Sequence, residues 1–519
     1  VSFQKETGSL YNLEATPAEG TAGKAVIRAG VLEALGLWPW PVREELAPMV
    51  HGALTGGGVR VERLTFSSWA GYRATAWVWT GEQAGAKGEK KPGMLMPHGH
   101  YAGGAIDPVV QVRAARLARA GYVVVVPDSV HVEDWATGVS SGGAMAWNNI
   151  RALDYLVSRE DVDGARIGIT GASGGAQQTQ YLMAIEDRLA AAAPVCMVTY
   201  FNNYLFEDWS HCECNHVPRM ARVADVPEIA ASFSPRASLF MSTKQDWTAT
   251  FEEHGWPEVQ RLYALAGAGG GARHKRFDVP HGYDGGMRAL AYTFFDPILR
   301  PVNPGATEEG FVSFGAEKLL GLGPRAAAPD ARMMAKEYMG RRGPATLAEV
   351  SPGIDWKIVG AWGKDAAPDD GKEDWKRRGL VGPDGVRFTV VSRGLEAGGA
   401  ITVVVPEKGR AELMVSPPAW LRGAAVIVEP RLLGESSPLR GAWQRNGMLL
   451  GCGEGYAQAR DIAQAIASIP GEHKVRLVGL GACGVSALIA ASVSPRVERV
   501  VIDPPRRINQ NNAAQAWMA

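Results

Sequence analysis

The chain has 519 residues, of which 46% are hydrophobic and 21% charged, as in ordinary globular proteins. Its 54 Lys and Arg residues balance its 54 Asp and Glu residues, which argues against nucleic-acid or anionic-membrane partners, because both attract a basic excess. The sequence contains no apolar run near the roughly 18 residues of a membrane span, and five cysteines in this length exclude a disulfide scaffold.

Residues 1–60 predict an N-terminal helical preface. Ala25–Leu37 has helical spacing, and the sequence Trp38-Pro39-Trp40-Pro41 ends it because proline cannot donate a hydrogen bond inside a helix. Because the chain begins at Val1 rather than Met, removal of a leader is an expectation, although the printed residues show none.

From about residue 60 the pattern alternates between strands and helices. Arg60–Phe66 and Arg73–Thr80 predict paired strands, and Val109–Ala120 predicts a helix that Gly121 ends. Tyr122–Val126 (YVVVV) predicts a strand buried on both faces. The alternation continues as helix, strand, helix and strand over 144–158, 166–170, 174–185 and 191–198. This order predicts an α/β fold with a mostly parallel sheet and helices on both faces.

The second half of the chain repeats the first. Arg166–Gly175 reads RIGITGASGG and Arg476–Val485 reads RLVGLGACGV, and an Ala-rich helix and an apolar strand follow each of them. The repeat predicts two α/β units in tandem. We expect the first unit at 61–305 and a second, degenerate unit at 306–519, with Cys483 at the position of Ser173.

A G-x-S-x-G sequence, Gly171–Gly175, lies between a predicted strand and a predicted helix. That context is the one a nucleophile elbow requires, since the tight turn lifts the serine hydroxyl above the sheet edge. A Gly-rich turn without catalytic function would need small residues too, but the strand and helix on either side favour Ser173 as a nucleophile.

A serine hydroxyl needs a base, and in this fold the acid and the histidine follow the serine in the chain. His281 follows the predicted strand His274–Val279, whereas His274 lies at the opposite end of that strand. Asp246 follows the predicted strand Leu239–Ser242 and is expected to orient His281. Asp278 and Asp284 are weaker candidates for the acid.

The loop Pro97–Gly104 (PHGHYAGG) is expected to complete an oxyanion hole. One backbone donor should be Gly174, and the other His100 or Tyr101. The interpretation of His98 as a structural histidine is favoured over a catalytic one.

The sequence His211-Cys212-Glu213-Cys214-Asn215-His216 resembles a metal cluster, but its spacing is poor for zinc, which structural sites bind through Cys-x2–4-Cys pairs. We therefore expect no metal and no other cofactor, and interpret this segment as a loop over the site. The candidate pocket residues are Tyr101, Trp209, Cys212, Cys214 and Trp247.

The first 300 or so residues resemble the acetylxylan-esterase-like α/β hydrolases. The motifs that carry the resemblance are MPHGHYAGG (96–104), AWNNIRALDYL (146–156), RIGITGASGGAQQTQYLMAIEDRLAAAAPVCM (166–197), CECN (212–215), QDWT (245–248) and VPHGY (279–283). The resemblance implies an α/β-hydrolase fold, a triad of Ser173, Asp246 and His281, and a secreted or periplasmic enzyme that hydrolyses esters on sugars.

These observations predict a metal-independent serine esterase that deacetylates a polysaccharide or oligosaccharide. Two alternatives are a prolyl-oligopeptidase-like peptidase, which shares the fold and triad order but usually carries a β-propeller, and a non-catalytic carbohydrate-binding homologue. In the second unit Cys483 has no later histidine, because the last one is His473. We therefore expect that unit to be catalytically inactive.

Overall fold

The computed structural model describes residues 17–69, 71–82, 89–129, 139–201, 203, 212–323, 330–342, 367–369, 372–381, 387–396, 399–407, 409–415, 418–421, 423–431, 433, 454–481 and 483–503. The chain divides into two compact units. The first comprises Val1–Glu133 and Val139–Arg342, and the second comprises Asp134–Gly138 and Gly343–Ala519. None of the described helices is long and apolar enough to cross a lipid bilayer.

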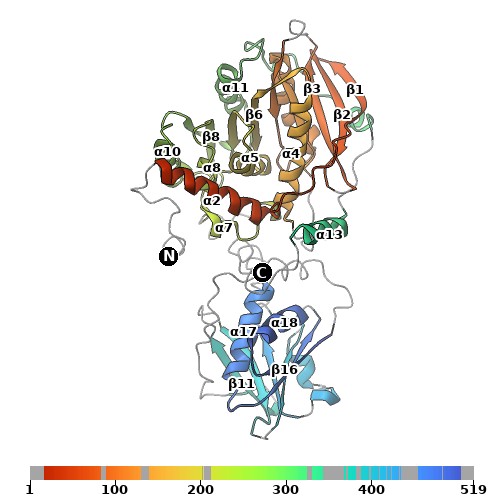
Figure 1. The fold of residues 1–519 in the computed structure, drawn as a ribbon, viewed down its shortest axis with the longest axis vertical. Helices are drawn as coiled ribbons and strands as arrows, with labels where there is room; N and C mark the ends of the chain where they lie inside the picture. Colours follow the sequence, from red (N-terminus) through yellow and green to blue (C-terminus); the bar gives the residue numbers. More distant parts are fainter. Residues whose placement is uncertain are drawn as a thin grey trace. The chain divides into compact units, whose positions relative to one another are not determined.

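The first unit is built on a nine-stranded sheet in the order β1-β2-β3-β5-β4-β6-β7-β8-β9 (Figure 1). Its strands are β1 Met49–Gly56, β2 Val59–Ser67, β3 Arg73–Gly81, β4 Lys91–Leu95, β5 Val123–Pro127, β6 Val162–Ala172, β7 Ala191–Val195, β8 Ala237–Gln245 and β9 Ala272–Pro280. Pairing is antiparallel from β1 to β5 and parallel from β5 to β9. Every residue of β5 is buried, as its continuous apolar run predicts.

Helices cover both faces of this sheet. The helices α4 (Ser141–Ser158) and α5 (Gly174–Ile185) pack on one face together with α2 (Pro17–Leu35), and α3 (Pro108–Ala120) and α11 (Gly285–Leu299) pack on the sheet through a separate apolar core (Figure 1). The other helices in the described part of this unit are α7 Met220–Val223, α8 Val226–Ala231, α9 Phe251–His254, α10 Trp256–Leu265, α12 Ala316–Leu320 and α13 Ala331–Arg342, with 3-10 turns at η1 Gly104–Ile106 and η3 Glu213–Asn215.

Local sequence explains where α3 begins and ends. The Asp107 side chain accepts a hydrogen bond from the Val109 amide at 3.1 Å, and Pro108 occupies the first helical position. Gly121 ends the helix with φ 103°, a conformation that favours glycine.

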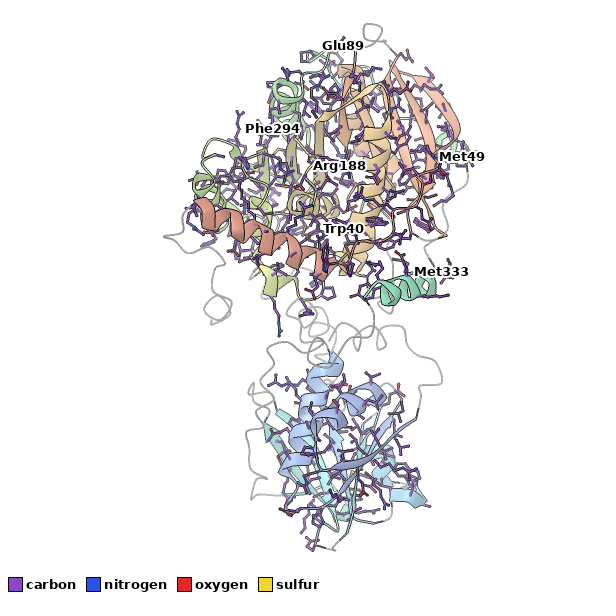
Figure 2. The ribbon with its side chains drawn as sticks, viewed as in Figure 1. Trp40, Met49, Glu89, Arg188, Phe294 and Met333 are labelled. Atoms are coloured by element: carbon purple, nitrogen blue, oxygen red, sulfur yellow. The ribbon has the colours of Figure 1, made fainter. Side chains whose placement is uncertain are left out.

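Aromatic contacts join a segment before the first sheet and a segment after it to the body of the first unit. Trp40, labelled in Figure 2, lies with its ring centroid 6.1 Å from that of Trp147 on α4. Phe311 and Phe314 lie 6.3 and 6.0 Å from Trp79 on β3. Because the segment after residue 305 packs on the first sheet in this way, the structural division falls after Arg342, later than the boundary expected at 305.

The second unit has a seven-stranded sheet in the order β10-β11-β12-β14-β13-β15-β16. Its elements are β10 Ala367–Asp369, β11 Lys372–Val381, β12 Arg387–Arg393, β13 Ile401–Val405, α15 Ala411–Val415, η4 Ala419–Leu421, β14 Ala425–Glu429, α17 Glu454–Ser468, β15 Val475–Leu480, α18 Cys483–Val493 and β16 Val497–Asp503. The order and direction of β10 to β16 match those of β1 to β7 strand for strand. Among the described residues, this unit has no strand that corresponds to β8 or β9.

Candidate active site

Ser173 lies at a sharp turn between β6 and α5. It has φ 57° and ψ −127°, a positive φ that is strained for a residue with a side chain. A Cβ atom at Gly171 or Gly175 would lie only 2.5 or 2.4 Å from the Pro97 carbonyl oxygen. The glycines on both sides of Ser173 are therefore required for the turn to pass under the loop that follows β4, as in a nucleophile elbow.

Asp246 and His281 follow β8 and β9, two adjacent parallel strands, and their side chains form a hydrogen bond. His281 Nδ1 lies 2.7 Å from Asp246 Oδ2. The other carboxylate oxygen of Asp246 accepts hydrogen bonds from the amide and the hydroxyl of Thr248, each at 2.6 Å. The carboxylate is buried, at 3% exposure, whereas the imidazole is partly exposed. In this hydrogen bond Nδ1 of His281 carries the hydrogen and donates it to the Asp246 carboxylate. In a neutral imidazole Nε2 then carries no hydrogen and can accept a proton.

All three residues follow the carboxyl ends of parallel strands β6, β8 and β9, so they share one edge of the sheet. Within the described part of the chain, His281 forms a hydrogen bond with Asp246 but not with Ser173. In enzymes without substrate such contacts are often long and tighten only when substrate binds.

Two further side chains support the pair. Cys196, directly after β7, donates its thiol to the Gly282 carbonyl at 3.3 Å, and burial, followed by the charge of Asp246, raises the pKa of Cys196. Cys196 therefore stays a neutral thiol beside the carboxylate. The Trp247 ring lies 4.4 Å from the His281 ring, between centroids. Sequence reasoning missed Cys196, whose one signal is its position immediately after an apolar strand.

The loop after β4 passes directly against the elbow. A Cβ atom at Gly99 would lie 2.6 Å from the Ala172 carbonyl oxygen and 3.0 Å from Ser173 Cβ. The Tyr101 amide donates to the Gly99 carbonyl at 2.9 Å, which favours His100 over Tyr101 as the second backbone donor. The Tyr101 side chain packs against the apolar core.

His98 lies under this loop and is held at both ring nitrogens. Nδ1 lies 2.8 Å from the Gly99 carbonyl, and Nε2 accepts from the Ser129 amide at 3.0 Å. Burial lowers the pKa of His98, so the ring stays neutral. Gln178 on α5 also binds the His98 carbonyl, at 3.2 Å. These contacts favour a structural role for His98, as its position in the sequence predicts.

His274 lies within β9, away from the loop that carries His281. Its Nε2 lies 2.9 Å from Ser242 Oγ, and its ring packs at centroid distances of 5.2 and 5.5 Å against Phe251 and Trp256. Burial lowers its pKa to about 4 from the ordinary 6.5. These contacts fit a packed histidine in the sheet.

We expect His274 to make the protein less stable in acid. Between about pH 6.5 and 4 the unfolded chain binds a proton at this residue that the folded chain does not, so stability is complete above pH 6.5 and falls as the pH drops toward 4. His274→Gln should reduce this fall by about 1–3 kcal/mol. Urea unfolding of both proteins at pH 7.5 and 4.5 measures it, and equal losses in both would contradict the expectation.

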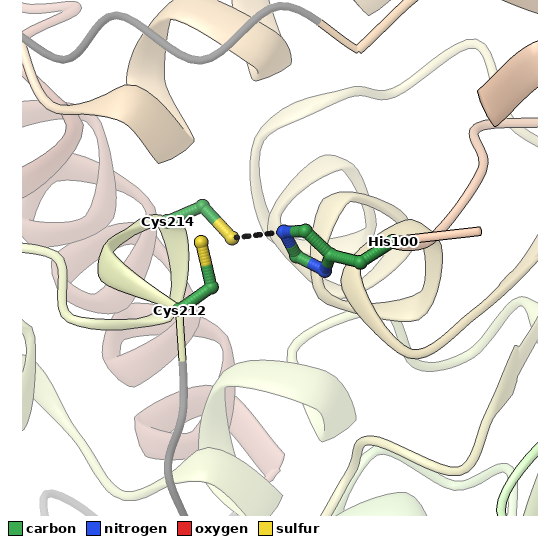
Figure 3. Close-up of side chains that lie close together, drawn as sticks. All are labelled: His100, Cys212 and Cys214. Carbon is green, nitrogen blue, oxygen red and sulfur yellow. Dashed lines mark hydrogen bonds between the residues drawn. The ribbon is translucent and has the colours of Figure 1, made fainter. Parts of the chain in front are cut away.

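The structure also brings together side chains that are far apart in the sequence. His100 and Cys214 lie on different loops, with Nε2 3.6 Å from Sγ, and Cys212 lies beside them (Figure 3). The ligand atoms of these three residues all lie within 4.8 Å of one another. The ligand atoms of Cys196, Asp246 and His281 also lie within 4.8 Å of one another. The hydrogen bond between Asp246 and His281 accounts for the closeness of these two side chains. Trp209 and His211 lie outside the described residues.

Comparison with known proteins identifies solved structures that share the fold of this chain. No protein-family model matches the chain. A curated relative, "Putative hydrolase YtaP" of Bacillus subtilis, is 26% identical over 140 residues, which make up 26% of this chain and 46% of that protein. The chain thus spans less than half the length of the curated relative that it matches.

Solved structures give a longer match. Methylesterase BT1017 is 25% identical with a TM-score of 0.53, over 66% of this chain and 80% of that one. An acetyl xylan esterase from Paenibacillus sp. R4 is 17% identical with a TM-score of 0.40, over 57% of this chain and 98% of that one. The chain resembles the acetylxylan-esterase-like α/β hydrolases. The assignment of the α/β-hydrolase fold rests on the match to Methylesterase BT1017. The same match supports the hydrolysis of an ester by this chain.

Proposed function

We propose that the first unit is a serine carboxyl-ester hydrolase that works through an acyl-enzyme. The observation that carries the proposal is the 2.7 Å hydrogen bond between His281 and the buried Asp246, at the same sheet edge as the strained Ser173 turn. A nucleophile, a base and an orienting acid in this chain order are the components of the α/β-hydrolase triad.

In the proposed reaction the Ser173 hydroxyl attacks the ester carbonyl while His281 Nε2 accepts its proton. The backbone amides of Gly174 and His100 bind the oxyanion. His281 then returns the proton to the leaving alcohol oxygen, and the acyl group remains on Ser173. A water molecule, deprotonated by His281, attacks the acyl-enzyme and releases the carboxylic acid. Asp246 holds the His281 tautomer throughout.

We propose an ester on a polysaccharide or oligosaccharide as the substrate, with acetyl as the first candidate. Support comes from the sequence motifs and from the esterases among the similar structures. The proposed location is secreted or periplasmic, as the resemblance to the acetylxylan-esterase-like hydrolases implies. The name of Methylesterase BT1017 makes a methyl ester the second candidate.

The experiment is a substrate panel with the full chain. Acetylated xylan, other acetylated glycans, methyl-esterified pectin and a dipeptidyl amide are compared by release of acetate, methanol or amine. Acetate release supports the first candidate and methanol release the second. Cleavage of the amide alone would favour a peptidase, and no cleavage of any ester would contradict the proposal.

The second unit is expected to contribute no nucleophile. Cys483 is buried, at 2% exposure, and begins α18. Its backbone does not have the positive φ of Ser173. Its thiol lies 3.5 Å from the Pro406 carbonyl oxygen. The strands that bring Asp246 and His281 to the first unit, β8 and β9, have no counterpart in the described part of the second sheet.

Cys483→Ala should therefore leave ester hydrolysis within about twofold of wild type, because the described part of the second sheet has no strands that would bring an acid and a base to this thiol. Steady-state rates on one ester substrate measure the effect, and thermal unfolding checks that the variant folds. Loss of activity in a folded variant would show that the thiol takes part in catalysis.

A further inference from the structure

The cluster of His100, Cys212 and Cys214 joins two loops of the first unit. His100 belongs to the loop after β4, and the two cysteines belong to the turn at η3. In Figure 3 the Cys214 sulfur points toward the imidazole and forms a hydrogen bond with its Nε2 at 3.6 Å, and the Cys212 sulfur lies beside the Cys214 sulfur. The proposed triad does not use the side chains of these three residues.

The distances fit the coordination shell of a zinc-like cation. Zn–N bonds of about 2.0–2.1 Å and Zn–S bonds of about 2.3 Å, at a tetrahedral angle, separate the nitrogen and the sulfur by roughly 3.6 Å. The observed Nε2–Sγ distance of 3.6 Å is the same. Since all three ligand atoms lie within 4.8 Å of one another, small side-chain movements would complete the arrangement.

The protein holds these side chains in place. The Asn215 amide donates to the Cys212 carbonyl at 2.9 Å, and His216 Nδ1 lies 3.1 Å from the same oxygen, which fixes the turn that carries both sulfurs. Cys214 is buried, at 2% exposure. The His100 ring is exposed, and it lies close to Gly174, because a Cβ atom at that glycine would lie 2.9 Å from its Cε1.

We propose that His100, Cys212 and Cys214 bind one divalent zinc-class cation. Two thiolates and an imidazole form a soft ligand set that suits zinc and balances its charge. Three protein ligands leave a fourth position open to water or to an oxygen of a bound molecule. Because the His100 ring contacts Gly174, the cation fixes the loop next to the elbow. The assignment does not rest on the proposed ester hydrolysis.

Residues 211–216 alone have poor spacing for a zinc site. The third ligand, His100, lies 114 residues before Cys214 in the chain and reaches the cysteines only through the fold.

The experiment titrates Co²⁺ and then Zn²⁺ into the reduced, chelator-treated full chain. We expect one Co²⁺ per chain, a thiolate-to-cobalt charge-transfer band in the near ultraviolet, release of protons as the thiols ionise, and displacement of Co²⁺ by Zn²⁺. The variants Cys212→Ser, Cys214→Ser and His100→Ala should each weaken binding by at least tenfold. Cys196→Ser and Cys483→Ser are matched controls that should keep the band.

A measurement on the unmodified protein guards against variants that fail to fold. Zinc should protect Cys212 and Cys214, but not other thiols, from alkylation, as mapped by mass spectrometry. Absence of the charge-transfer band in fully reduced protein would overturn the proposal. So would a band that persists in Cys214→Ser, or a Cys212–Cys214 disulfide that resists reduction in the folded chain.

Discussion

Ser173→Ala should lower ester turnover by about 10⁴-fold or more, because without the triad serine only binding and the oxyanion hole remain to accelerate the reaction. The fold should survive, since the substitution removes one hydroxyl, and the glycines that shape the turn stay in place. Alanine keeps the Cβ atom that already occupies the positive φ of this position. Turnover of a chromogenic acetate ester measures the loss.

Ser158→Ala is the matched control. Ser158 ends α4, shortly before β6 begins, and so lies at the sheet edge opposite to Ser173, where its hydroxyl donates to the Tyr155 carbonyl at 2.8 Å. Its turnover should stay near wild type. If Ser173→Ala kept a tenth of wild-type activity, the nucleophile would have to be another residue.

Asp246→Asn should lower turnover by about 10³–10⁴-fold through the tautomer of His281. The Thr248 amide and hydroxyl both donate to one carboxylate oxygen of Asp246, at 2.6 Å each, so an asparagine at 246 would keep its oxygen there. Its NH₂ group would then face His281 Nδ1 in place of the oxygen that lies 2.7 Å away. His281 would present a protonated Nε2 to Ser173 and could not accept its proton.

Asp278→Asn is the control for this variant. Asp278 is an exposed carboxylate within β9 that pairs with Lys244 at 3.1 Å, and it is one of the two weaker acid candidates in the sequence. Its removal should change turnover less than twofold. The kcat of each variant on the same ester separates the two carboxylates, and equal losses would show that Asp246 does not orient the base.

The sequence predicted the elements that carry the triad because each has a strong local signal. The helix that follows Ser173 has the predicted bounds, 174–185. The strands before Asp246 and His281 are longer than predicted, at Ala237–Gln245 and Ala272–Pro280. Residues at their ends belong to the strands because they pair with the neighbouring strand. Periodicity alone does not detect such ends.

Contacts between distant segments could not be predicted in this way. The position of Cys196 beside Asp246 depends on the pairing of β7 with β8, and the position of His100 beside Cys214 depends on two loops that meet over the elbow. The packing of Phe311 and Phe314 on Trp79, which extends the first unit past residue 305, is also set by tertiary contacts. Trp209 falls outside the described residues and stays a prediction.

The most direct measurement for the proposed nucleophile is labelling with a fluorophosphonate, followed by intact-mass analysis and peptide mapping. A serine activated by a neutral histidine attacks this reagent and forms a stable adduct. We expect one adduct per chain, on the peptide that contains Ser173, and loss of ester hydrolysis in proportion to labelling. An active protein that takes up no label, or one whose label lies on a residue other than Ser173, would contradict the account.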